Sequence, residues 1–171
     1  RSRRQRQMCI RDSPLLKNAD EILFYGGSFN PWHEGHTACI ELAPKSIPLV
    51  VLPDQNPHKE LSKNRELDPN DLLNNLKKIR ENIFLYQGFI DSAESTPTID
   101  WVLELKQKFP KLDFSLVLGF DSFTNLDSWK DYKKLISTIK KFYIVSRLDD
   151  QELKDLKLAK YYEISKQTQF I

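Results

Sequence analysis

The chain has 171 residues, of which 40% are hydrophobic and 29% charged, and its formal net charge is +2. This length supports one domain with a buried core, and the composition is ordinary for a globular protein. No apolar stretch approaches the roughly 18–20 residues of a membrane span, so we expect no membrane segment.

The basic balance comes from the beginning of the chain. Five arginines against one aspartate give residues 1–13 a net charge of +4, so the rest carries −2, and we expect no nucleic-acid partner. These residues include Met8, the only methionine, and resemble translated sequencing-adapter read-through. We interpret them as a non-native leader, with a genuine basic arm as the alternative. Cys9 and Cys39 offer no disulfide framework, which favours a reducing, cytoplasmic setting.

Strand-like and helix-like segments alternate along the chain. Near-continuous apolar runs such as Leu49–Leu52 are typical of strands covered on both faces of a parallel sheet. Strands are predicted over 22–26, 48–53, 83–90, 113–118 and 141–146, with a weaker sixth near 161–165. Helices are predicted over 70–82, 98–109, 129–140 and 149–158, besides a short one after His36. This alternation predicts an α/β fold, a Rossmann-like doubly wound parallel sheet of five to six strands with helices on both faces.

Polar residues gather just past the ends of the predicted strands. The first strand is followed by Gly26-Gly27-Ser28, the second by the segment 54–59, the fourth by Gly119-Phe120-Asp121-Ser122 and the fifth by Ser146-Arg147. Ligands of open parallel sheets bind outside the carboxyl ends of the strands. The sequence therefore predicts one crevice that collects these motifs.

The segment Gly26–His36 carries the most specific pattern. Its glycines let the backbone turn out of the strand close to a ligand, and a helix start after such a turn favours bound phosphate. His33 and His36, spaced i, i+3, are expected on one face of the first helical turn. Two donors there suit a polyphosphate whose charge grows as a leaving group departs. The alternatives are a metal site or core packing.

This segment, Gly-Gly-Ser-Phe-Asn-Pro-x-His-x-Gly-His, resembles the signature of the nucleotidyltransferase superfamily, in the form found in bacterial nicotinate mononucleotide adenylyltransferases. Further segments resemble the same family in order: Pro53–Lys59, Glu94 with Thr96–Asp100, Gly119–Ser122 with Trp129, and Val145–Arg147. The resemblance covers roughly residues 21–147. It implies a single nucleotidyltransferase domain over residues 14–171, which we expect to be truncated at its C-terminus.

The resemblance also implies roles for individual residues. His33, His36 and Lys59 would be the catalytic residues, which hold the ATP phosphates and stabilise the departing pyrophosphate. The other ATP-binding residues would be Gly26, Gly27, Ser28, Phe29, Arg147 and Ser165. The mononucleotide would be bound by Asn30, Thr98, Asp121 and Trp129, with Trp129 stacked on the pyridine ring. Helix capping is the alternative for Thr98 and Asp121, and core packing is the alternative for Trp129 and the expected role of Trp32 and Trp101.

The activity that follows from the resemblance is transfer of the adenylyl group of ATP to nicotinate mononucleotide. Phosphate oxygen is already a nucleophile, so positioning and charge stabilisation suffice. We find no carboxylate cage for a metal and expect Mg²⁺ to arrive on the ATP phosphates. The partners are thus ATP and nicotinate mononucleotide, and a homo-oligomer is left open.

The chain departs from the family pattern in two places. The closing Ile-Ser-Ser-Thr-x-Ile-Arg segment is represented only by Ser165 and Thr168 near the end of the chain, and Pro97 stands where the family has a tyrosine. Two alternatives therefore stay open. One is the same reaction on nicotinamide mononucleotide, and the other is a nucleotide-binding relative without catalysis.

Overall fold

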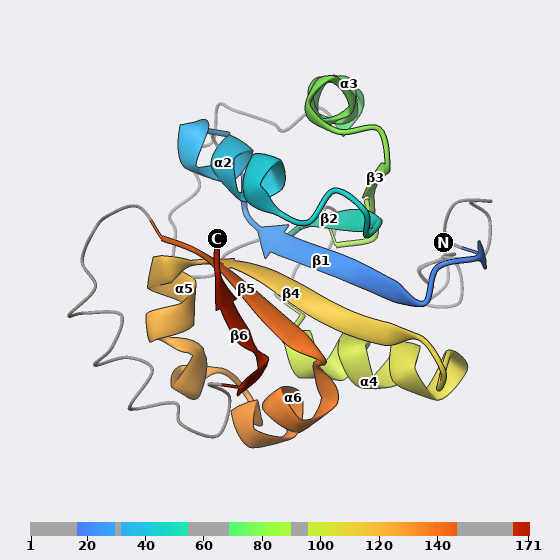
Figure 1. Ribbon diagram of the computed structural model, residues 1–171, viewed down its shortest axis with the longest axis vertical. Helices are drawn as coiled ribbons and strands as arrows, with labels where there is room; N and C mark the ends of the chain where they lie inside the picture. The colour runs from blue at the N-terminus through green and yellow to red at the C-terminus, as the bar shows by residue number, and fades with distance from the viewer. Residues whose placement is uncertain (1–16, 30–31, 55–68, 90–95, 147–165) are drawn as a thin grey trace.

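Six parallel strands form one sheet in the order β3-β2-β1-β4-β5-β6. The computed structural model describes residues 17–29, 32–54, 69–89, 96–146 and 166–171. The strands are β1 (Glu21–Gly27), β2 (Leu49–Pro53), β3 (Ile83–Leu85), β4 (Asp113–Gly119), β5 (Lys141–Val145) and β6 (Thr168–Phe170). The chain runs outward from β1 to β3, then returns to place β4 on the other side of β1 (Figure 1). The strand order therefore reverses between β1 and β4.

Helices cover both faces of the sheet (Figure 1). One face carries α2 (Glu34–Leu42) and α3 (Pro69–Ile79). The other carries α4 (Thr98–Lys108), the short α5 (Phe120–Thr124), the 3₁₀ turn η3 (Leu126–Ser128) and α6 (Tyr132–Thr138). The predicted Rossmann-like, doubly wound parallel sheet is confirmed.

Alternate side chains of each strand build two separate cores. From β1, Ile22 and Phe24 enter the core under α4 and α6, whereas Leu23 and Tyr25 enter the core under α2 and α3. This alternation follows from the period of two along a strand, and it explains why the strands read as continuous apolar runs. Among the described residues, no helix is long and apolar enough to cross a membrane.

Several element boundaries differ from the predictions. Strand β3 ends at Leu85, not at residue 90, because the chain turns at Gly88. Helix α6 begins at Tyr132, not at 129, because Asp131 before it adopts a left-handed backbone with φ 47°. The short α5 was not predicted. The predicted helix 149–158, the predicted strand 161–165 and the proposed leader, residues 1–13, lie outside the described residues.

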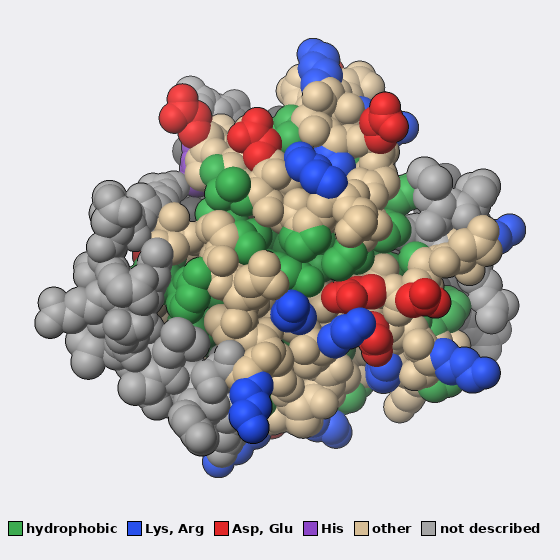
Figure 2. All heavy atoms as spheres, in the orientation of Figure 1, with side chains coloured by type: hydrophobic (Ala, Val, Ile, Leu, Met, Phe, Trp, Pro, Cys, Tyr) green, Lys and Arg blue, Asp and Glu red, His purple; other side chains and the backbone are tan. Residues whose placement is uncertain are grey.

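The amino ends of β1, β4 and β5 carry a network of charged side chains. Lys140 Nζ lies 3.0 Å from carboxylate oxygens of both Glu21 and Asp113. The fully buried hydroxyl of Ser115 donates to Glu21 Oε1 at 2.5 Å. Figure 2 shows acidic and basic side chains side by side over this part of the sheet. The network fastens the end of the sheet opposite to the one where the predicted crevice lies.

Candidate active site

A pocket of about 520 Å³ opens at the carboxyl ends of β1 and β4, where the strand order reverses. This volume is typical of a site for a small organic ligand, and the position is the one where open α/β sheets bind ligands. The walls come from the ends of β1, β2 and β4, from the segment around Phe89, from the start of α4, and from α5 with the segment that follows it. The predicted crevice is therefore present.

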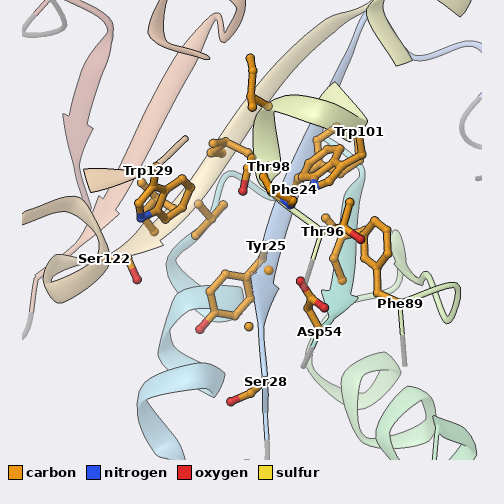
Figure 3. A pocket seen from close by; sticks show the side chains of 18 of the residues that line it. Phe24, Tyr25, Ser28, Asp54, Phe89, Thr96, Thr98, Trp101, Ser122 and Trp129 are labelled. Carbon is orange, nitrogen blue, oxygen red and sulfur yellow. The ribbon is translucent and has the colours of Figure 1, made fainter. Parts of the chain in front are cut away.

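The pocket has an aromatic side chain on each of two facing walls. Trp129 lies near Ser122 on one wall, whereas Trp101 and Phe89 lie on the other (Figure 3). Trp101 also packs edge-on against Phe24 with ring centroids 4.9 Å apart. Trp101 therefore has the expected role in core packing and also forms part of the pocket wall.

The end of β1 forms the floor and lip of the pocket. Gly26, Gly27 and Ser28 line it. Phe29 then takes a left-handed backbone with φ 48° and buries its whole side chain against Tyr25 and Trp32. The ring of Phe29 lies in the core and does not line the pocket, so any contact of this residue with a nucleotide would involve its backbone.

His33 and His36 open helix α2 shortly after this turn. The Nδ1 atom of His33 accepts a hydrogen bond from the Gly35 amide at 3.1 Å, and Nδ1 of His36 accepts one from the His33 amide at 3.3 Å. The two rings stack with centroids 3.6 Å apart. Because each Nδ1 is an acceptor, each neutral imidazole carries its proton on Nε2. At the start of α2, each neutral imidazole therefore has an Nε2–H group, which can donate a hydrogen bond to a phosphate oxygen. Neither histidine lines the pocket itself.

The start of α4 and the segment after β4 supply further predicted residues. Thr98 lines the pocket as the first residue of α4, and Pro97 holds the N-cap position instead. Trp129 also lines it, with part of its ring against the core. Asp121 is exposed on α5 and does not line the pocket, and the N-cap of α5 is Gly119. The structure thus brings Thr98 and Trp129 together with the glycine turn, whereas Asp121 is not among the residues that line the pocket.

Four predicted site residues lie outside the described part of the chain: Asn30, Lys59, Arg147 and Ser165. Their assignments stay predictions. Within the described ranges, no three or more His, Cys, Asp or Glu side chains gather in a way that could hold a metal ion.

Two charged side chains of the pocket were not predicted. Asp54 follows β2 and points into the space between the walls (Figure 3), and its amide donates to the carbonyl of Gly27 at 2.9 Å. Lys130 follows Trp129, and its Nζ lies 2.9 Å from both carboxylate oxygens of Asp100 on α4. The place of Asp54 after a strand end was a usable signal. Lys130 gave none, because it is one of many lysines in the chain.

A buried arginine fixes the far end of α2. Arg80, which follows α3, is 4% exposed, and its guanidinium donates to the backbone carbonyls of Ala43, Pro44 and Ile47. It also donates to Asn82 Oδ1 at 2.6 Å. Burial lowers the pKa of Arg80 to about 10, so the group stays charged at neutral pH. A positive charge at the C-terminus of α2 is the favourable sign for the helix dipole.

Sequence comparison identifies the class of protein. A family model described as cytidylyltransferase-like matches residues 24–166, which is most of the chain. The chain therefore belongs to the cytidylyltransferase-like family.

Curated relatives narrow this assignment. A "probable nicotinate-nucleotide adenylyltransferase" of Helicobacter pylori is 32% identical over 140 residues, which cover 78% of each chain. One of the same description from Leptospira borgpetersenii is 25% identical over 160 residues, which cover 90% of this chain and 79% of the relative. Within its family, the chain thus belongs with the nicotinate-nucleotide adenylyltransferases, and the resemblance recognised in the sequence is confirmed.

Solved structures agree in fold. The nicotinic acid mononucleotide adenylyltransferase of Plasmodium falciparum, in complex with NaAD, superposes with a TM-score of 0.64 at 23% identity. The match covers 89% of this chain and 74% of that one.

Proposed function

We propose that this protein transfers the adenylyl group of ATP to nicotinate mononucleotide and releases pyrophosphate. The observation that carries the proposal is the pocket at the reversal of strand order, which lies beside a helix that begins with two stacked, backbone-oriented histidines. The names of the relatives supply the substrate pair. The product of the reaction would be nicotinate adenine dinucleotide, an intermediate in the synthesis of NAD.

The reaction is an in-line displacement at phosphorus. An oxygen of the mononucleotide 5′-phosphate attacks the α-phosphorus of ATP and forms a new P–O bond. The bond from that phosphorus to the bridging oxygen of the β-phosphate breaks, and pyrophosphate leaves with the electron pair. No proton has to be removed from the nucleophile, so catalysis reduces to alignment of the two phosphates and stabilisation of charge on the leaving group.

The paired imidazoles are suited to the second task. Their Nε2–H groups would donate to the ATP phosphates, and these bonds strengthen as negative charge moves onto pyrophosphate. The backbone of Gly26, Gly27, Ser28 and Phe29 would pack against the nucleotide. Four more residues that lie outside the described ranges would complete the site: Lys59, Arg147 and Ser165 at the ATP phosphates, and Asn30 at the mononucleotide.

Thr98 and Trp129, which line two walls of the pocket, are suited to the pyridine mononucleotide. An indole ring at the edge of an open pocket offers a face for stacking of another ring. Asp121, which is exposed on α5, would accept hydrogen bonds from a nucleotide sugar or base. Mg²⁺ would enter with ATP as part of the substrate and keep several of its own waters.

The test of this function is release of pyrophosphate from Mg-ATP in the presence of nicotinate mononucleotide. Loss of one donor to the developing charge costs roughly 10²–10³-fold in turnover, and we expect that loss in His36→Ala. Circular dichroism and the thermal unfolding midpoint check that the variant is folded.

The outcomes separate three interpretations. Release that depends on both nicotinate mononucleotide and His36 supports the proposal. Wild-type turnover in a folded His36→Ala variant contradicts the role of the histidine pair. A folded protein that binds ATP but releases no pyrophosphate with any pyridine mononucleotide is a non-catalytic relative.

A further inference from the structure

The pocket carries two charged side chains among the described residues, and only one of them is positive. Asp54 lies at the end of β2 and Lys130 follows Trp129. The residue that carries the positive charge therefore directly follows the one whose indole would stack on the pyridine ring. On such a ring, nicotinate differs from nicotinamide only in that a carboxylate replaces a neutral carboxamide.

Lys130 already holds a carboxylate. Its Nζ lies 2.9 Å from Oδ1 and 2.9 Å from Oδ2 of Asp100, which is the third residue of α4. The ion pair therefore joins two walls of the pocket, the segment that carries Trp129 and the helix start that carries Thr98. A ring bound between these walls would lie within reach of the Lys130 side chain, which lines the pocket.

The ammonium group has the capacity for a second carboxylate. Its three N–H donors exceed the two that the Asp100 oxygens use. The pair is also half exposed, with side chains 53% and 44% accessible for Lys130 and Asp100. Exposed ion pairs contribute little to folding, so Lys130 can turn toward a ligand at small cost, and Asp100 competes with that ligand for it.

We propose that Lys130 determines specificity in this pocket by binding the carboxylate of nicotinate mononucleotide, and that Asp100 tempers this preference. The inference rests on the proposed adenylyl transfer and concerns the choice between the two pyridine mononucleotides. Lys130 recognises the acid through charge, and the neutral amide gains no equivalent interaction.

Two variants that break the same ion pair distinguish this role from a structural one. Lys130→Met removes the cation, whereas Asp100→Asn keeps it and removes its competitor. The quantity to measure is the ratio of kcat/KM for nicotinate mononucleotide to that for nicotinamide mononucleotide. Because both values come from one preparation, the ratio is independent of the fraction of folded protein. Lys130→Arg tests rescue by charge, and Lys133→Met is the control on the exposed side of α6.

We expect the two variants to move the ratio in opposite directions. Lys130→Met should lower it roughly tenfold, as expected for loss of one charged hydrogen bond, while Asp100→Asn raises it. Lys130→Arg should largely restore the preference and Lys133→Met leave it unchanged. A ratio that is unaltered in Lys130→Met, or lowered to the same extent in both variants, overturns the inference. The proposed function still holds in that case if the wild type turns over nicotinate mononucleotide. If the wild type turns over neither mononucleotide, the proposed function fails and this inference fails with it.

Discussion

At the scale of single residues, the glycines around the pocket have different physical reasons to be glycine. A Cβ atom on Gly27 would lie 2.8 Å from the ring of Phe29, so the packing of the protein itself excludes a side chain there. A Cβ atom on Gly119 would have no atom within 4 Å, and its backbone, φ −67° and ψ 156°, is open to any residue. Gly119 lines the pocket. The absence of a side chain at Gly119 therefore leaves room for a ligand in the pocket.

This difference predicts that the two alanine variants fail in different ways. Gly119→Ala should change the unfolding free energy by less than about 1 kcal/mol, because the stiffer unfolded chain offsets the loss of a favoured residue at the N-cap of α5. Its KM for a nucleotide substrate should rise roughly tenfold, the usual effect of one misplaced methyl group. Urea unfolding and steady-state pyrophosphate release measure the two quantities.

Gly27→Ala is the matched comparison. The buried ring of Phe29 cannot move aside, so the variant should lose about 1–3 kcal/mol of unfolding free energy. Equal destabilisation of both variants would contradict the assignment of Gly119 to the ligand.

The sequence singled out residues that carry a rare chemical type in a motif. The glycine turn and Trp129 stood out, and the structure puts them around one pocket. Lys130 and Asp100 did not stand out, because they are 30 positions apart in the chain and only the packing of α4 against the segment after α5 pairs them. Such a pair has no local signature.

At the scale of elements, helix α2 is fastened at both ends by side chains. Its first turn is capped by the His33 and His36 imidazoles, and the carbonyls of its C-cap Ala43 and of the next residue, Pro44, accept hydrogen bonds from Arg80, which follows α3. Arg80 therefore positions, from the opposite end, the helix that carries the two histidines.

Removal of this clamp should destabilise the protein. Arg80→Met leaves the buried or partly buried carbonyl oxygens of Ala43, Pro44 and Ile47 without this donor, at an expected loss of about 3 kcal/mol in unfolding free energy. Lys78→Met, on the exposed side of the same helix end, should change it by less than about 0.5 kcal/mol. Urea unfolding compares the two variants. An Arg80→Met variant as stable as Lys78→Met would show that the carbonyls find other partners.

Elements were predicted well where side-chain pattern alone decides them. The apolar runs of β1, β2, β4 and β5 placed these strands within one or two residues of their observed bounds. The break between η3 and α6 was missed because it depends on the left-handed backbone at Asp131. Aspartate tolerates this conformation, but a single aspartate before a helix does not signal it. Strand β6 has three residues, of which the middle one, Gln169, is exposed, and it lies at the edge of the sheet next to β5. Its sequence therefore lacks the apolar run of a central strand.

At the scale of the whole molecule, the two ends of the sheet differ in kind. The carboxyl ends of β1 and β4 form the pocket, whereas the amino ends carry the network of Glu21, Asp113, Ser115 and Lys140. The hydrogen bonds of Lys140 to Asp113 and to Glu21 hold the pKa of this lysine above its usual value of 10.5. Burial, with a smaller effect of Glu21, raises the pKa of Tyr143 above 10.0.

Both shifts predict loss of stability in alkali. Each group holds its proton more tightly in the folded state than in the unfolded state, so their contribution is complete below the unfolded pKa values. Unfolding free energy should therefore decline as the pH rises above about 10. Lys140→Met and Tyr143→Phe should each flatten this decline, measured by urea unfolding over an alkaline pH series, and Lys134→Met on the outside of α6 should not. A decline of the same slope in all variants would contradict this origin.

The burial of the Phe29 ring in the core affects how the preceding glycine turn can bind a ligand. A left-handed backbone at a bulky residue is unfavourable by roughly 1–2 kcal/mol, and here the complete burial of the ring offsets it. The turn from Gly27 to Phe29 is therefore shaped by folding, before any nucleotide arrives. An unanchored glycine loop would have to lose its conformational freedom on each encounter with a ligand. In this protein the turn loses its conformational entropy once, when the chain folds. Ordering of this turn therefore does not reduce the free energy of the interaction with phosphate.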